Sequence, residues 1–153
     1  MFRRLTLLTL ALALVAVPAS AQSAFGLRAG ASSGPDQFVF GAHVDTAPLL
    51  ENLTFRPNLE IGIGDRLTLA ALNFEFAYWI PLENSRWRVY MGGGPAANIL
   101  AFHDDHPARG DTRVEGGLNI MLGLQHDRGL FTELKVGAID SPDIKFTIGY
   151  VLR

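Results

Sequence analysis

Two consecutive segments in the middle of the chain alternate between apolar and polar residues over an unusual length. One face of the first segment would carry Leu53, Phe55, Leu59, Ile61 and Ile63. The opposite face would carry Thr54, Arg56, Asn58, Glu60 and Gly62. A period of two residues predicts a β-strand rather than a helix. The polar tripeptide Gly64-Asp65-Arg66 then separates two strands of one hairpin, which spans residues 53–80.

The same alternation recurs along the chain. It predicts eight strands, at residues 24–31, 38–45, 53–63, 67–80, 86–98, 112–125, 130–138 and 144–152. Neighbouring strands can all be joined as antiparallel hairpins. No interior segment has a helical period, and none approaches the run of about 20 apolar residues that a membrane helix needs. The sequence therefore predicts an all-β fold, either a barrel or a sandwich.

The first 21 residues have a different character. Arg3 and Arg4 precede an apolar run over residues 5–17, and Ala19-Ser20-Ala21 follows it. This pattern predicts a secretory signal peptide at residues 1–21 and one folded domain at residues 22–153. A membrane anchor is the alternative, but the apolar run is short for a span.

The composition limits which kinds of binding partner are expected and how the fold can be stabilised. Without the two arginines of the signal peptide, 13 − 2 = 11 basic residues face 15 acidic ones, a formal charge of −4. This balance argues against a nucleic-acid partner. The chain has no cysteine, so the sheet must hold an exported protein together without disulfides.

Charged residues gather on the second face of the predicted strands. They are Arg28, Asp45, Arg56, Glu60, Glu75, Arg88, Glu115, Glu133, Lys135 and Lys145. The outer face of a soluble sandwich would also be polar. However, soluble surfaces usually carry many lysines, and Lys135 and Lys145 are the only two here. Five acids against five bases on one face are typical of paired, buried charges.

The aromatic residues of the apolar face lie towards the strand ends. If strands alternate up and down, five of them fall at one end: Phe25, Phe55, Tyr78, Trp87 and Tyr150. Phe38 and Phe40 fall towards the other, together with Phe146. This distribution is typical of two membrane-interface girdles. We therefore predict an eight-stranded antiparallel up-and-down transmembrane β-barrel that is apolar outside and has a charged, polar lumen.

The short turns predict the register of the hairpins. A two-residue Asp65-Arg66 loop puts Arg56 across from Glu75 and Asn58 across from Asn73. A loop at residues 81–84 would put Ala77 opposite Arg88, so that Glu75 lies between Arg56 and Arg88.

The remaining connections predict the topology. Asp127-Arg128-Gly129 reads as a three-residue loop with Gly129 in the left-handed conformation. Connections 46–52, 81–85 and 127–129 would lie on the periplasmic side, and 32–37, 65–66, 99–111 and 139–143 outside. Pro57 and Pro95 lack ladder donors and are candidate bulges.

The last two predicted strands carry a further signal, FTELKVGAIDSPDIKFTIGYVLR at residues 131–153. With the signal peptide and eight alternating strands, it resembles the close of small eight-stranded bacterial outer-membrane barrels such as the outer-membrane protein A-type domain. The resemblance implies a monomer in outer-membrane lipid, inserted by the β-barrel assembly machinery after Sec-type export, without a cofactor. Such barrels usually end in an aromatic residue, whereas here Tyr150-Val151-Leu152 is followed by Arg153.

Few residues form patterns that are typical of a metal-binding or catalytic site. His103-Asp104-Asp105-His106 is the only local cluster of metal-ligand type, and a solvated loop is the interpretation we favour. Gln125-His126-Asp127 has no adjacent serine to act as a nucleophile. Each acid of the polar face has a base nearby, which does not make a catalytic dyad. We therefore expect no enzymatic activity.

Three functional hypotheses remain open. The first is a small outer-membrane barrel with a structural or surface-interaction role, whose lumen is filled by Arg/Glu ion pairs. Its external partner is undetermined, and the 99–111 loop is its variable element. The second is a narrow pore for small solutes, gated when Arg56–Glu75 exchanges partners with Arg88. The third is a soluble periplasmic, lipocalin-like binding barrel with its apolar face inward.

Overall fold

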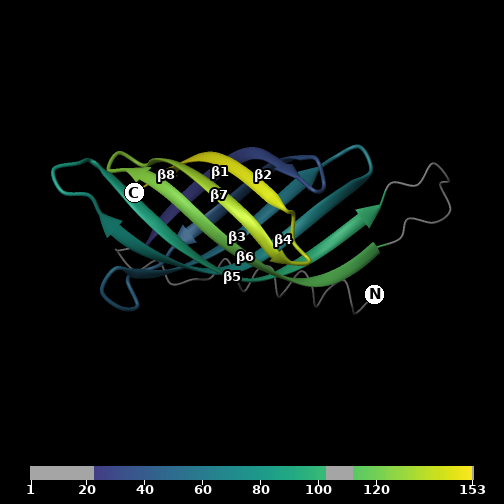
Figure 1. The fold of residues 1–153 in the computed structure, drawn as a ribbon, viewed down its shortest axis with the longest axis horizontal. Helices are drawn as coiled ribbons and strands as arrows, with labels where there is room; N and C mark the ends of the chain where they lie inside the picture. The colour runs from purple at the N-terminus through teal and green to yellow at the C-terminus, as the bar shows by residue number, and fades with distance from the viewer. Residues whose placement is uncertain (1–22, 103–111, 153) are drawn as a thin grey trace.

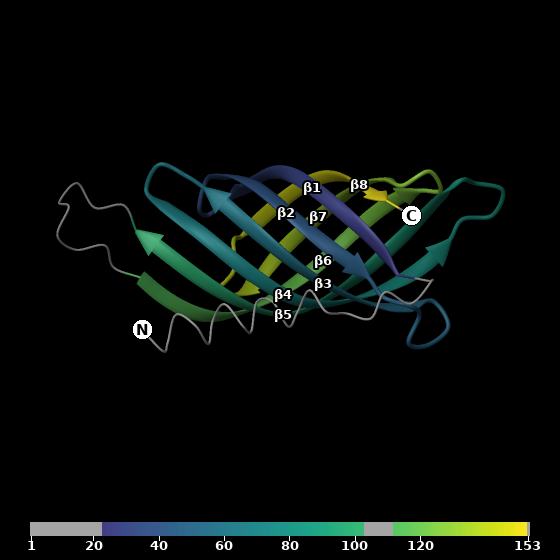
Figure 2. The same ribbon diagram turned by 180° about the vertical axis from the view of Figure 1, so that it is seen from behind.

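Eight antiparallel strands follow one another around a closed barrel in the computed structural model, which describes residues 23–102 and 112–152 (Figures 1 and 2). The strands are β1 (Ala24–Ser33), β2 (Gln37–Asp45), β3 (Leu53–Ile63), β4 (Leu67–Pro81), β5 (Trp87–Phe102), β6 (Thr112–His126), β7 (Leu130–Ile139) and β8 (Ile144–Leu152). Each pairs with its sequence neighbours, and β1 pairs with β8 to close the sheet. The predicted up-and-down barrel fold is confirmed. The predicted signal peptide and the cluster His103-Asp104-Asp105-His106 lie outside the described residues.

The connections divide between the two ends of the barrel. The connections after β2, β4 and β6 lie at one end with the start of β1 and the end of β8, and we call it the turn end. Those after β1, β3 and β7 lie at the other, with the end of β5 and the start of β6, and we call it the loop end. The described residues contain no helix of the length and hydropathy that crosses a membrane.

The β3–β4 register agrees with the sequence prediction. Arg56 pairs with Glu75 and Asn58 with Asn73. The Gly64 N–H donates to the Leu67 carbonyl at 3.2 Å, which closes the two-residue loop as predicted. Gly129 has φ 104°, so the turn between β6 and β7 also has its predicted left-handed residue.

The β4–β5 register differs from the prediction by four residues. Arg88 pairs with Pro81, and Ala77 pairs with Gly92 rather than with Arg88. The connection is longer than predicted because residues 82–86 all lie outside the ladder, with Asn84 at φ 56°. The other end of β5 was also predicted wrongly: the strand continues to Phe102, so residues 99–102 belong to the wall and not to a loop.

The two strand prolines end or interrupt pairing without making a bulge. The β2–β3 ladder stops at the pair His43–Asn58, next to Pro57, while the β3–β4 register passes Pro57 unchanged. Pro95 coincides with a two-residue gap in the β4–β5 pairing. The irregularity in register lies elsewhere, between Leu118 and Asn119 opposite the end of β7. Proline removes a ladder donor, which explains the gaps without a change of register.

Polar side chains lie inside the barrel and apolar side chains outside. Arg56, Asn73 and Glu75 have no exposed surface, whereas Phe38 is 71% exposed and Ile120 58% exposed. Phe76, which alternates with Glu75 along β4, is exposed as well. Alternation along every strand therefore places the charged face in the lumen, the reverse of a soluble barrel.

Glycines in the wall make room for bulky lumen side chains on the neighbouring strand. A Cβ at Gly123 would lie 2.0 Å from the ring of Tyr90, with which Gly123 is paired. A Cβ at Gly149 would lie 2.4 Å from the ring of its partner Phe131. In an eight-stranded barrel the lumen is just wide enough for side chains, and these glycines leave room for the rings of Tyr90 and Phe131.

Candidate functional site

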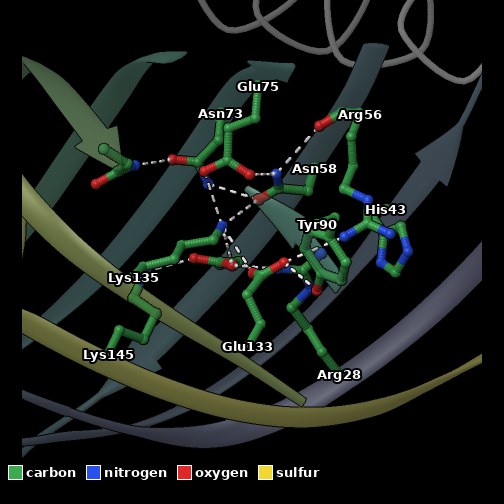
Figure 3. A network of polar contacts seen from close by, with 12 residues as sticks. Arg28, His43, Arg56, Asn58, Asn73, Glu75, Tyr90, Glu133, Lys135 and Lys145 are labelled. Atoms are coloured by element: carbon green, nitrogen blue, oxygen red, sulfur yellow. Dashed lines mark hydrogen bonds and ion pairs between the residues drawn. The ribbon is translucent and has the colours of Figure 1, made fainter. Parts of the chain in front are cut away.

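The lumen holds equal numbers of acidic and basic side chains. The buried acids are Asp45, Glu60, Glu75 and Glu133, and the buried bases are Arg28, Arg56, Lys135 and Lys145. Four negative charges therefore meet four positive ones among the described residues. Figure 3 shows the centre of this network, where polar amides lie between Glu75, Glu133 and the basic side chains. Isolated buried charges would be very costly in free energy, so a charged interior of this kind is stable only if its charges are paired.

Glu60 on β3 collects three cations from across the barrel. Its Oε1 lies 2.9 Å from Lys135 Nζ and 3.3 Å from Arg28 Nη1. Its Oε2 contacts Lys145. The cations come from β1, β7 and β8, so this carboxylate joins walls that are far apart in sequence.

Glu133 on β7 is the second centre of the network. It contacts Arg28 through Oε1 and lies 3.2 Å from Arg56 Nη1 through Oε2. The Tyr90 hydroxyl donates to Oε2 at 2.7 Å. The side chains that meet here come from β1, β3, β5 and β7, four alternate strands of the barrel.

Arg56 links this centre to the turn end. Its Nε lies 2.5 Å from Asp45 Oδ1, and Nη2 donates to Gln125 Oε1 at 3.4 Å. The guanidinium also lies over the Tyr90 ring, 4.4 Å from the centroid. The planar cation thus has carboxylate partners in its plane and an aromatic ring on its face.

A chain of amides leads from Glu75 towards the loop end. Asn58 Nδ2 donates to Glu75 Oε2 at 2.6 Å, and Asn73 Nδ2 donates to Asn58 Oδ1 at 2.7 Å. Asn119 Nδ2 then donates to Asn73 Oδ1 at 2.8 Å. Lys135 Nζ neutralises Glu75 at 2.9 Å from Oε1.

Eight of the ten charged residues predicted on the second face lie in this connected network: Arg28, Asp45, Arg56, Glu60, Glu75, Glu133, Lys135 and Lys145. The other two lie elsewhere. Because of the four-residue difference in register, Arg88 lies near the turn end, with its guanidinium 4.5 Å from the Trp79 ring centroid. Glu115 lies near the loop end and pairs with Arg113 at 3.4 Å. The expected position of Glu75 between Arg56 and Arg88 is therefore wrong.

The predicted interfacial aromatics lie on the outer face or its edges. Phe25, Phe38, Phe40, Tyr78 and Tyr150 are all more than 40% exposed. Phe55 and Trp87 are half-buried: Phe55 packs on Phe76 at 5.2 Å between ring centroids, and Trp87 packs on His126 at 4.8 Å.

The predicted list of charged lumen residues left out the aromatic side chains that pack among them. Tyr90 and Phe131 have no exposed surface, and His43 is buried against Phe131 with 5.2 Å between ring centroids. A signal for them was present, because each follows the same parity as the charged residues of its strand. Across residues 23–102 and 112–152, no group of three or more His, Asp or Glu side chains is placed to hold a metal ion.

Solved structures with the same fold are outer-membrane barrels. The chain superposes on the N-terminal β-barrel domain of Pseudomonas aeruginosa OprF with a TM-score of 0.62, at 11% identity over 85% of this chain and 96% of that one. Neisserial surface protein A gives 0.59 at 11% identity over 85% and 93%. The outer membrane enzyme PagL gives 0.51 at 12% identity over 85% and 98%.

The likeness is one of fold. No protein-family model matches the sequence, and the search of curated proteins found no relative. The chain has the closed eight-stranded fold of small outer-membrane barrels, as the sequence resemblance implied.

Proposed function

We propose that this protein is an integral bacterial outer-membrane protein whose barrel spans the bilayer and whose lumen network is structural. The observation that carries the proposal is the inverted distribution of polarity. Fully buried charges fill the inside, and the outer face is a continuous surface of exposed Leu, Ile, Val and Phe. An apolar outer surface of this extent is stable only against lipid.

Cell fractionation tests the location. The full chain, expressed with its N-terminal segment, is expected in the outer-membrane fraction, and its gel mobility is expected to change on heating as the barrel unfolds. Recovery in the periplasmic extract, with unchanged mobility, would contradict the proposal. The distribution of polarity argues against the soluble lipocalin-like alternative, because the apolar face of such a barrel would have to line the lumen.

The closed lumen supports a structural or surface-interaction role over transport. Arg56, Glu60, Glu75 and Glu133 are at most 1% exposed, so side chains fill the middle of the barrel. An interior of eight strands leaves no continuous water path. The proposal accordingly assigns any surface interaction to the loop end.

A narrow gated pore is the second candidate, and Lys135 is the observation in its favour. Its Nζ lies 2.9 Å from both Glu60 and Glu75 and 3.6 Å from Glu133. A cation among three carboxylates can exchange partners with little displacement, a role that Arg88 cannot fill from its place beside Trp79. Conductance recordings in planar bilayers test this candidate. Channel openings of the native protein that vanish in Glu75→Gln would establish the pore, and a native protein without channel openings would rule it out.

The proposal includes no catalytic role, although one structure of the same fold is an enzyme. His126 Nδ1 lies 2.9 Å from Asp127 Oδ1 at the turn end, while Gln125 points into the lumen with 1% exposure. These three neighbours therefore do not converge on one site.

A further inference from the structure

A pocket of about 190 Å³ opens at the loop end, between the long strands β4–β6 and the two short turns that face them. Two cross-strand pairs form its inner wall: Leu69 opposite Leu100, and Asn98 opposite Glu115. Figure 1 shows β5 and β6 extending past the other strands at this end. The wall is thus apolar on one side and polar on the other.

Hydrogen bonds across the mouth fix the shape of the pocket. The amide of Asn98, a residue only 2% exposed, donates from Nδ2 to the Asp140 carbonyl at 2.6 Å and holds the β7–β8 turn inward. The Asp143 N–H donates to the Gly34 carbonyl at 3.4 Å and joins that turn to the β1–β2 turn. A site formed in advance loses less entropy on binding.

The polar groups at the pocket favour a positively charged ligand. The Glu115 carboxylate is 28% exposed, and its one ion-pair partner among the described residues, Arg113, is 62% exposed and 3.4 Å away. Ser141 Oγ is shielded from solvent and has no hydrogen-bond partner within the described residues. Residues 34–36, 64–66, 112–117 and 140–143 at this end carry five acids and two bases.

We propose that this pocket binds a small organic cation, with its ammonium group against the Glu115 carboxylate, next to Ser141, and its apolar body against the paired side chains of Leu69 and Leu100. An enclosed cavity of about 150 Å³ holds a benzene molecule, so this pocket suits one ring or a short alkyl chain. The site is separate from the ion-pair network of the lumen. Cation binding at this site is inferred from the pocket alone and does not depend on whether the barrel conducts solutes.

Benzylamine is a suitable probe, and benzyl alcohol is its uncharged counterpart of nearly the same shape. Backbone amide spectra of the full barrel in detergent micelles report where each binds. We expect shifts at Gly117, Ser141 and their neighbours, and benzylamine affinity at least about tenfold above that of benzyl alcohol. Equal affinities, or shifts spread over the lipid-facing surface, would overturn the proposal.

Two variants with matched controls separate the site from the general charge of the mouth. Glu115→Gln is expected to weaken benzylamine about fivefold, as for a partly exposed charge pair, and Arg113→Gln to strengthen it because Glu115 loses its competitor. Asp65→Asn and Arg66→Gln change the same charges at an exposed turn outside the pocket, and we expect little effect. If the control variants shift the affinity as much as the pocket variants, the proposal is wrong. The comparison of Arg113→Gln with Arg66→Gln gives this test even if Glu115→Gln does not fold.

Discussion

Several charged residues of the lumen have more than one partner, so the loss of one of them affects more than one ion pair. Lys135 shows this most clearly because its single ammonium lies within 3.6 Å of three buried carboxylates. Replacing one member of a buried pair leaves an uncompensated charge, which costs far more than the pair itself contributes.

Lys135→Met is therefore expected to lower the free energy of unfolding by about 3–5 kcal/mol. Urea unfolding in lipid vesicles, followed by tryptophan fluorescence, measures the change. Arg66→Met, on an exposed turn, is the control and should stay within about 0.5 kcal/mol of the native protein. A Lys135→Met barrel as stable as the control would show that the network carries no such stabilisation.

The wall glycines make a second prediction at this scale. Gly123→Ala places a methyl group 2.0 Å from the buried Tyr90 ring, whereas Gly116→Ala on the same strand meets nothing within 4 Å. We expect the first to destabilise the barrel by about 1–3 kcal/mol, as over-packing does, and the second to be neutral or stabilising. Equal effects of the two substitutions in the same unfolding assay would contradict the claim that Gly123 is needed to leave room for the Tyr90 ring.

At the scale of the strand, the alternation of side chains was enough to find all eight elements and the face of each. The β3–β4 register could also be predicted, because a two-residue loop leaves one pairing only. The β4–β5 register could not: a longer connection allows several pairings of the same parity, and the prediction chose one four residues away.

Disulfide trapping distinguishes the two β4–β5 registers in a chain that has no native cysteine. Tyr78→Cys with Met91→Cys, which are paired and both exposed, should cross-link on oxidation. Tyr78→Cys with Trp87→Cys, the pair of the predicted register, should not, since Trp87 lies about 13 Å further along the strand. Cross-linking of the second pair alone would contradict the observed register.

At the scale of the whole molecule, the fold was predictable and the contacts across the lumen were not. Alternation indicates that Glu75 and Lys135 both point inward, but only barrel closure and strand tilt bring β4 and β7 into contact 2.9 Å apart. The pocket at the loop end was beyond sequence reasoning for the same reason, since its walls come from β4, β5, β6 and two turns.

A charge on the outer face should be costly if that face contacts lipid. Leu122→Arg, in the middle of β6 at a residue that is 51% exposed, is expected to destabilise the membrane-inserted barrel by about 2–4 kcal/mol. The same unfolding assay in vesicles measures it, and Arg128→Leu at the exposed β6–β7 turn is a control for the exchange of the two residue types. A neutral effect of Leu122→Arg would place that position in water.

The central claim is that the apolar outer face contacts the bilayer and the polar face does not. Spin labels placed singly from Leu118 to Leu124 in the barrel reconstituted in lipid vesicles test it directly, with molecular oxygen as the lipid-soluble relaxation agent and a nickel chelate as the aqueous one. We predict oxygen accessibility that peaks at Leu118, Ile120 and Leu122, which are 38–58% exposed, and falls at Asn119 and Met121, which are at most 4% exposed. Nickel accessibility that peaks at Leu118, Ile120 and Leu122 would contradict the account.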